Sequence, residues 1–219
     1  MKYSLIYSDP PWSHNNKASR ATAENHYSTM PLTELKRLPV WDLAAEDCVL
    51  AMWWSPVMPL EAIQLAEAWG FSVRNMKLFT WGKLTQHAER HIQKYIDDAL
   101  SLTQFISAGD VLDSVRGHIR VNLGNYTRSN SEDCLIAVRG RGIERIDASV
   151  RQLILEPISS HSKKPDEARK RLVQLFGDVP RIELFARQSS HGFDVWGDEC
   201  GTADISLTPG CARTNRVEW

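Results

Sequence analysis

A short apolar run near the amino end stops at two consecutive prolines, and this limits what the chain can build there. Residues 3–8 have the composition of a buried strand, and Asp9-Pro10-Pro11-Trp12 follow directly. Proline has no N–H to donate to a strand ladder, so the strand must end before Pro10. The fixed φ of proline also makes the turn that follows stiff. The sequence therefore predicts a strand that delivers a carboxylate and an indole to a rigid corner.

Segments with the character of strands and helices alternate along the rest of the chain. Further strands are predicted by apolar runs over residues 48–54, 71–81, 134–138, 150–155 and 181–186, the last of which is expected to be the final strand. Helix-start and helix-stop residues predict helices over 31–38, 59–69 and 165–176. This alternation is typical of a three-layer α/β domain, in which ligands bind at the carboxyl ends of strands.

Residues 84–117 differ in texture from the rest of the chain, because apolar residues recur there at helical spacing between charged ones. We expect one or two amphipathic helices inserted after a strand. A packed decoration, a lid, a dimer face and a rest for nucleic acid all remain open as roles for this insertion. We expect one domain over residues 1–200 that contains the insertion, followed by a loose tail over 201–219.

The charge balance excludes a chain that binds nucleic acid through bulk positive charge. Lys and Arg number 26, Asp and Glu number 27, and the formal net charge is −1. Any nucleic-acid contact must therefore come from local patches of basic residues. The amino end has no leader-like apolar core, and no apolar run approaches the ~20 residues that a membrane helix needs. We expect a cytoplasmic protein with no membrane partner.

Neither a metal site nor a disulfide framework is expected. The cysteines are far apart and form no Cys-x-x-Cys pair, so we expect reduced thiols at Cys48, Cys134, Cys200 and Cys211. His87 and His91 would share one face of a helix, but no third ligand follows at a recognisable spacing. A solvated helix face is the simpler interpretation of this histidine pair.

The corner formed by Asp9, Pro10, Pro11 and Trp12 offers hydrogen-bond acceptors beside an aromatic face. Asp9 is an ionised acceptor, the prolines present carbonyl oxygens without N–H groups, and Trp12 supplies a flat ring. An open corner of this kind suits a planar ligand whose NH2 hydrogens point at Asp9 and the Pro10 carbonyl. Such hydrogen bonds draw the amine nitrogen of adenine toward tetrahedral geometry and free its lone pair for a methyl donor held in line. The alternative is a strand-ending turn with a surface carboxylate and a packed indole.

Further motifs follow the corner in order along the chain. They are Tyr27-Ser28-Thr29-Met30, an apolar run that reaches Trp53, Trp81-Gly82-Lys83, His161-Ser162-Lys163-Lys164-Pro165-Asp166-Glu167, Glu183-Leu184-Phe185-Ala186-Arg187 and Trp196-Gly197-Asp198-Glu199. Together with the corner, these motifs resemble those of the adenine-N6 methyltransferases of the DPPW type. That family includes the catalytic subunit of the eukaryotic messenger-RNA adenosine methyltransferase and many compact bacterial and phage members.

The resemblance implies a Rossmann-like, S-adenosylmethionine-dependent methyltransferase fold in permuted order, with a mixed, mostly parallel sheet. The catalytic half would come first in the chain and the main cofactor half last. Asp9, Pro10, Pro11 and Trp12 would bind and orient the target adenine. On the substrate side we place Trp12, Tyr27, Trp54 and Lys83. S-adenosylmethionine would lie beside Asp9, Glu183, Phe185, Arg187, Gln188, Asp198 and Glu199.

The substrate is expected to be adenine in a nucleic acid, and DNA is preferred because the compact relatives are mostly associated with DNA modification. RNA remains open as the substrate. Related tetrapeptides that end in Tyr serve cytosine N4 or protein amides, so Trp12 favours adenine. A non-catalytic subunit with the same fold is the alternative from another class of protein. A homodimer is left open as the assembly.

Overall fold

The computed structural model describes residues 2–13, 29–124, 126–159, 163–190 and 192–198, together with residues 200 and 207. Its centre is a seven-stranded sheet in the order β5-β3-β4-β2-β1-β6-β7. The strands are β1 (Tyr3–Ser8), β2 (Ala44–Trp54), β3 (Ser72–Leu84), β4 (Ser131–Arg139), β5 (Leu153–Pro157), β6 (Arg181–Leu184) and β7 (Asp194–Trp196).

The sheet is mixed and mostly parallel, as predicted. Strand β1 is parallel to both of its neighbours, β2 and β6, and the same direction continues from β6 into β7. Strand β4 is antiparallel to β2 and β3, and β3 is parallel to β5. All strands except β4 therefore share one direction. Because β4 is reversed, its first residues lie at the edge where the other strands end.

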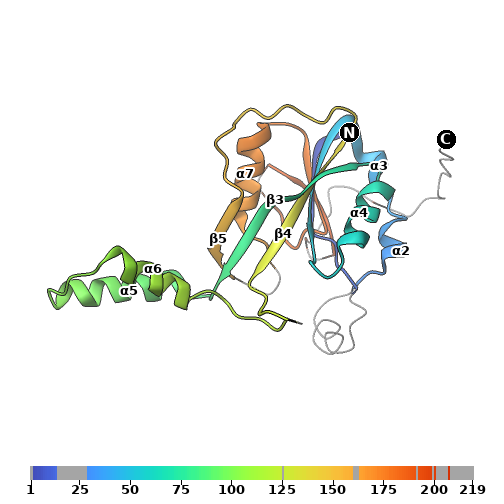
Figure 1. The fold of residues 1–219 in the computed structure, drawn as a ribbon. Coiled ribbons are helices and arrows are strands. Elements are labelled where there is room, and N and C mark those ends of the chain that lie inside the picture. The colour runs from blue at the N-terminus through green and yellow to red at the C-terminus, as the bar shows by residue number, and fades with distance from the viewer. Residues whose placement is uncertain are drawn as a thin grey trace.

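The helices cover both faces of the sheet (Figure 1). The helices of the described residues are α2 (Leu32–Leu35), α3 (Val40–Leu43), α4 (Pro59–Ala68), α5 (Ala88–Ser101), α6 (Ala108–Gly117) and α7 (Asp166–Phe176), of which α5 and α6 lie away from the sheet. Helix α7 lies on one face, whereas α4, with α2 and α3 beside it, lies on the other. The α/β architecture expected from the alternation of segments is thus confirmed.

The central strands are apolar on both faces because each face carries its own core. Leu5 and Tyr7 of β1 belong to the core under α7, whereas Ile6 belongs to the core under α4. This is the alternation that a strand imposes on successive side chains. On the α4 side, the indole of Trp69 is fully buried and donates a hydrogen bond to the Leu35 carbonyl at 2.9 Å. That bond ties α4 to α2.

The helices expected between residues 84 and 117 are α5 and α6, which form a hairpin that projects away from the sheet (Figure 1). Helix α6 begins with a capping box, in which Ser107 and Asp110 satisfy each other's backbone N–H groups. The chain returns to the sheet at the hairpin's base, where the Thr85 N–H donates to the His118 carbonyl at 2.8 Å. This bond anchors the base of the hairpin where β3 ends.

Two details of the sequence prediction are wrong. The helix expected over 31–38 is only the short α2, since Leu38 precedes Pro39 and a residue before proline is disfavoured in helical geometry. The strand expected over 181–186 ends at Leu184, because Phe185 adopts a φ of 60° and turns the chain out of the sheet. The short β7 then follows, so 181–186 is not the final strand.

Among the described residues, every helix falls short of the length and apolar character that a membrane crossing requires.

Candidate active site

The end of β1 delivers Asp9 to the centre of the sheet's carboxyl edge. The strand is flanked by β2 and β6, so Asp9 emerges between the ends of both neighbours. The Asp9 N–H lies 3.5 Å from the Leu184 carbonyl at the end of β6. Because β4 is reversed, Glu132 near its start lies at the same edge. Residues distant in sequence are thereby brought to one place.

The proline corner is held by hydrogen bonds of its own backbone. The Trp12 N–H donates to the Pro10 carbonyl at 2.9 Å, and the Met30 N–H donates to the Pro11 carbonyl at 2.8 Å. The Trp12 indole N–H donates to the Trp53 carbonyl at 3.2 Å. The Pro10 carbonyl therefore already accepts a hydrogen bond, whereas the sequence suggested that it would be free. A carbonyl oxygen has a second lone pair, so it can still accept another hydrogen bond.

The Asp9 carboxylate belongs to a chain of alternating charges. Lys164 lies just before α7, and its Nζ is 2.7 Å from Oδ2 of Asp9 and 3.2 Å from Oε2 of Glu132. Lys83, near the end of β3, pairs with Oε1 of the same Glu132. Asp9, Lys164, Glu132 and Lys83 thus form a connected network with balanced charge. The corner is not open as expected, since one Asp9 oxygen is already bound by an ammonium.

Burial and charge act in opposite directions on the two carboxylates of this network. For Asp9, loss of hydration raises the pKa above 3.8, and this outweighs the opposing effect of Lys164. For Glu132, loss of hydration also raises the pKa, but Lys164 and Lys83 together overcome it and lower the value to about 2. The pKa of Lys164 is raised because both carboxylates favour its charged form. Glu132 is therefore the firmly ionised member, and Asp9 is the group closer to taking up a proton.

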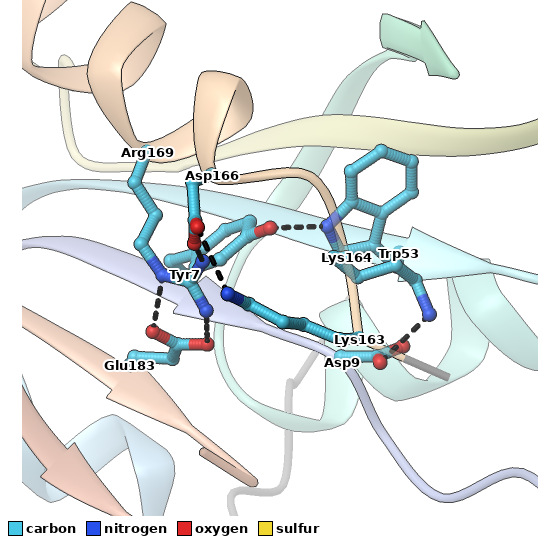
Figure 2. Close-up of polar contacts among 8 residues, drawn as sticks. All are labelled: Tyr7, Asp9, Trp53, Lys163, Lys164, Asp166, Arg169 and Glu183. Carbon is cyan, nitrogen blue, oxygen red and sulfur yellow. Dashed lines mark hydrogen bonds and ion pairs between the residues drawn. The ribbon is translucent and has the colours of Figure 1, made fainter. Parts of the chain in front are cut away.

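A second buried ion pair lies on the other side of Asp9 (Figure 2). Arg169 of α7 donates from Nε and Nη2 to both oxygens of Glu183 in β6, at 2.7 and 2.6 Å. The guanidinium also lies 5.5 Å from the ring centre of Tyr7. The hydroxyl of Tyr7 accepts a hydrogen bond from the Trp53 indole at 2.6 Å. These contacts connect α7, β6, β1 and β2 beneath the edge.

A small cavity of about 20 Å³ separates the two ion pairs. It is lined by Asp9, Lys163, Lys164, Arg169, Glu183, Phe185, Arg187 and Gln188. Lys163 is held toward α7 by Asp166 at 2.9 Å. The cavity therefore combines two carboxylates with several cations, a donor set that suits a ligand carrying both an ammonium and a carboxylate.

Phe185 forms an aromatic wall of this cavity on strained backbone. Its φ of 60° is rare for a residue other than glycine. The ring stacks on Trp69 at 6.5 Å between centroids and meets Trp196 edge-on at 5.2 Å. The Ala186 N–H donates to the Trp196 carbonyl at 2.9 Å. Two core contacts and this bond hold the turn in a conformation that the sequence pattern alone does not predict.

A larger cavity of about 330 Å³ lies on the far side of Lys164. Its walls come from β3, β5, α5 and the start of α7, and they include Trp81, Glu156 and Lys170. Neither Asp9 nor Trp12 lines it, so it is not the acceptor corner. Among the residues described, no group of three or more His, Cys, Asp or Glu side chains is arranged to hold a metal ion.

The family profile described as MT-A70 matches residues 3–104 and 112–199. This match covers most of the chain and includes both Asp9 and the Phe185 turn. The chain belongs to the MT-A70 family. The gap in the match, residues 105–111, covers the second half of the connection between α5 and α6 and the first turn of α6.

Two relatives are similar over nearly the whole MT-A70 chain. Type II methyltransferase M.MunI of Mycoplasma sp is 29% identical over 225 residues, which cover 94% of this chain and 81% of that protein. N(6)-adenine-specific methyltransferase METTL4 of Homo sapiens is 26% identical over 201 residues, which cover 90% of this chain. The chain spans only 37% of the length of the human protein.

The remaining residues predicted for the site of this MT-A70 protein are placed unevenly. Lys83 joins the Asp9 network through Glu132. Trp54 packs toward the α4 core, and its indole N–H donates to the Met76 carbonyl at 2.9 Å. Asp198 is exposed and does not line the small cavity. Tyr27 and Glu199 lie outside the described residues.

Glu132, Lys164 and Arg169 are the site residues that sequence reasoning missed. The sequence does not show that the strand carrying Glu132 runs in the reverse direction. That reversal places the start of β4, and with it Glu132, at the edge where the other strands end. Lys164 lay within a motif that was noted, yet its partner across the sheet could not be inferred from spacing. Glu183 was expected beside the cofactor and lines the cavity, but both of its oxygens already accept from Arg169.

Proposed function

We propose that the chain is an S-adenosylmethionine-dependent methyltransferase that acts on the N6 amine of adenine in DNA. The chain is a methyltransferase by family, and the cofactor, the polymer and the roles of individual residues are the substance of the proposal. The observation that carries it is the position of Asp9, a half-buried carboxylate at the carboxyl end of a central strand, which pairs with Lys164 and lines a cavity shared with the Arg169–Glu183 ion pair.

Asp9 is suited to bind the target amine because it is an acceptor held in a rigid place. Lys164 occupies Oδ2, and no hydrogen bond from a described residue reaches the second oxygen of the carboxylate, so that oxygen can accept from an incoming N–H. The Pro10 carbonyl retains one lone pair for the other N–H of the amine. Hydrogen bonds to both positions fix the nitrogen's orientation, which supplies a large part of the rate enhancement in a displacement reaction.

Lys164 and Glu132 act by positioning. Glu132 holds Lys164 in place, and Lys164 opposes the rise in the Asp9 pKa that burial causes. The amine loses one proton when its nitrogen gains a methyl group, and the Asp9 carboxylate is close enough to receive it. A raised Asp9 pKa favours that transfer more than an ordinary carboxylate would.

The residues around the small cavity fit the chemistry of S-adenosylmethionine, which supplies a sulfonium-bound methyl group when bound. Each oxygen of Asp9 has two lone pairs, so the oxygen that binds the target amine can also accept from the ammonium of the amino-acid end, while Lys163 and Arg169 offer cations for its carboxylate. Phe185 presents a ring edge or face to the sulfonium or adenosyl part. The cavity is much smaller than the about 300 Å³ or more of a typical ligand site, so its rim side chains must shift on binding.

DNA is the preferred polymer because the chain is similar over 81% of the length of M.MunI, which is named as a type II methyltransferase. The name of the human relative METTL4 states specificity for adenine N6. A base paired in a duplex must leave the stack to reach Asp9, at a cost of a few kcal/mol. RNA is the alternative substrate.

Transfer of a tritiated methyl group tests the proposal directly. The chain is incubated with labelled S-adenosylmethionine and with matched DNA and RNA, each single- and double-stranded and each with an adenine-free control. We expect label in adenine-containing DNA, and N6-methyladenine after digestion to nucleosides. Label only in RNA would replace the polymer, whereas label at cytosine or in the adenine-free controls would overturn the choice of base.

The alternative is a non-catalytic subunit with this fold, and methyl transfer together with measurable cofactor binding would exclude it. If isothermal titration detected no S-adenosylmethionine binding and no polymer became labelled, the charged network would be structural and the proposal would fail.

A further inference from the structure

A two-sided ribbon connects the projecting hairpin to β4 beside the Asp9 network. We define it as residues 119–124 and 126–130. Its two sides are joined where the Asn122 N–H donates to the Ser129 carbonyl at 3.0 Å. Gly124 approaches the other side closely, since an added Cβ would lie 2.0 Å from the Thr127 carbonyl oxygen. The ribbon's tip therefore has a built conformation that requires glycine.

The ribbon is bonded directly to a residue of the charged network. The Arg120 N–H donates to the Lys83 carbonyl at 2.8 Å, and the Lys83 N–H donates to the Asn130 carbonyl at 2.9 Å. The N–H and the carbonyl of Lys83 are thus both hydrogen-bonded to the ribbon, while its side chain pairs with Glu132. A ligand bound to the ribbon would lie next to the edge where Asp9 is found.

The ribbon carries large apolar side chains that are exposed to solvent, because no other described part of the chain packs over them. Leu123 is 88% exposed and Tyr126 is fully exposed, and Val121 is also exposed. The adjacent Arg128 is exposed as well. Exposed apolar side chains that cluster on a protein surface commonly mark a binding site. The exposed side chains of the ribbon therefore indicate a surface that binds a partner.

The charge of this region is one-sided. From Ser114 to Ser131 the sequence contains no Asp or Glu, but it contains Arg116, Arg120 and Arg128. Arg116 is paired with Asp113 of α6 at 2.6 Å, so the ribbon's own arginines, Arg120 and Arg128, supply its net positive charge. The outer hairpin differs, since α5 and α6 carry acidic residues along their length, including Asp97, Asp98 and Asp110. Helices α5 and α6 also carry basic residues, but acidic ones outnumber them there, so the net positive charge lies in the part of the insertion nearest the network. This is the local patch that a chain of net charge −1 would need for a polyanion.

We propose that the ribbon is a nucleic-acid contact element, in which Tyr126 stacks on a base close to the target adenine and Arg128 contacts a phosphate. The inference rests on the proposed function for the identity of the polymer. A ring with no protein partner can stack on any base, and guanidinium groups bind phosphate with good geometry. The same stacking would also support the neighbours of a base that leaves a duplex.

Fluorescence anisotropy with a labelled 20-nucleotide DNA of mixed sequence, single-stranded and as a duplex, tests the ribbon without any methyl transfer. Tyr126→Ala is expected to weaken binding about tenfold, the scale of one base–aromatic stack, and Tyr126→Phe is expected to bind like the wild type. Phe105→Ala is the matched control, because Phe105 is 91% exposed but lies between α5 and α6 at the outer end of the insertion. Equal binding by Tyr126→Ala and wild type, or an equal loss in Phe105→Ala, would overturn the proposal.

The arginine contact is tested by the salt dependence of the same binding. Arg128→Gln is expected to reduce the slope of log K against log salt by about 1, because one phosphate contact is lost. Arg74→Gln is the control, since Arg74 is exposed at the opposite end of β3. An unchanged slope in Arg128→Gln would contradict the phosphate contact, and circular dichroism confirms that each variant is folded.

The outcomes separate the ribbon from the proposed function. Weaker DNA binding by Tyr126→Ala in a chain that methylates no nucleic acid would support the ribbon and refute the methyltransferase proposal. Methylation of DNA by the wild type, with unchanged DNA binding by Tyr126→Ala, would support the methyltransferase proposal and refute the ribbon. The same series with RNA of identical sequence identifies the polymer, and a wild-type chain that binds neither would overturn the ribbon proposal.

Discussion

The Nζ of Lys164 lies 2.7 Å from Oδ2 of Asp9, so the carboxylate at the end of β1 is held by a cation from the start of α7. The two residues are 155 positions apart in the sequence, and the fold brings them together at the edge of the sheet where β1 ends. The contact limits the direction from which an amine reaches Asp9, and it opposes the rise in the Asp9 pKa caused by burial.

Replacement of Lys164 by Met is expected to raise the Asp9 pKa further, because its nearest cation is lost. The acid limb of the pH profile of kcat/KM for methyl transfer should then move to higher pH. Unfolding in urea should show a loss of about 2 kcal/mol, since Asp9 and Glu132 are left without their shared partner. Lys170→Met is the control, because Lys170 lies exposed on α7, the helix that follows Lys164. An acid limb that stays in place would rule out this role of Lys164.

Glu132 is expected to make the folded state sensitive to acid. Its pKa is about 2 in the folded chain against an ordinary 4.5, so its charged form stabilises the fold at and above pH 4.5. This contribution is lost as the pH falls from 4.5 toward 2. Glu132→Gln should therefore be less stable at pH 7 and should lose less stability on acidification. Urea unfolding at several pH values checks this, and parallel curves for the two proteins would contradict it.

The fork of Arg169 on Glu183 is expected to matter for cofactor binding. Arg169→Lys keeps the charge but cannot donate to both oxygens in the same geometry. We expect S-adenosylmethionine to bind about tenfold more weakly, which is roughly 1.4 kcal/mol. Arg171→Lys provides a control on the same helix, because Arg171 bonds to Glu167 and to two backbone carbonyls of the β5 region. Isothermal titration that finds equal affinities in both variants would exclude the role of Arg169.

Gly197 is expected to be required for the turn that carries Phe185. A Cβ at this position would lie 2.2 Å from the carbonyl oxygen of Ala186, and backbone atoms cannot move aside cheaply. Gly197→Ala should destabilise the fold by about 2 kcal/mol or more and weaken cofactor binding. Gly117→Ala, at the end of α6 where nothing lies within 4 Å, should be neutral or stabilise by about 0.5 kcal/mol. Thermal melts that rank the two variants in the opposite order would contradict this.

The parts of the fold that could be predicted are those set by local patterns. The strand that ends at Asp9 was predicted because two prolines cannot continue a ladder, and α7 was predicted because Gly177 follows its last apolar residue. The reversal of β4 could not be predicted, since the apolar run over 134–138 carries no sign of its direction. The short β7 was missed because its three residues fall below the length at which alternation is recognisable.

The candidate site follows the same division. Asp9, Phe185 and Arg187 were identified from motifs, and the cavity brings them together. The partners of Asp9 and Glu183 were not identified, because ion pairs between α7 and the sheet depend on how the helix crosses from β5 to β6. Their detection required the packing of Lys164 and Arg169 against β1, which no spacing in the sequence encodes.

Methyl transfer by Asp9→Asn compared with the wild type is the most direct test of the central claim. The substitution keeps the size of the side chain but removes the charged acceptor, and cofactor titration shows whether the neighbouring cavity still binds. The account predicts N6-methyladenine in DNA treated with the wild type, none above background with Asp9→Asn, and measurable cofactor binding by both. Full methyl transfer by Asp9→Asn would contradict it.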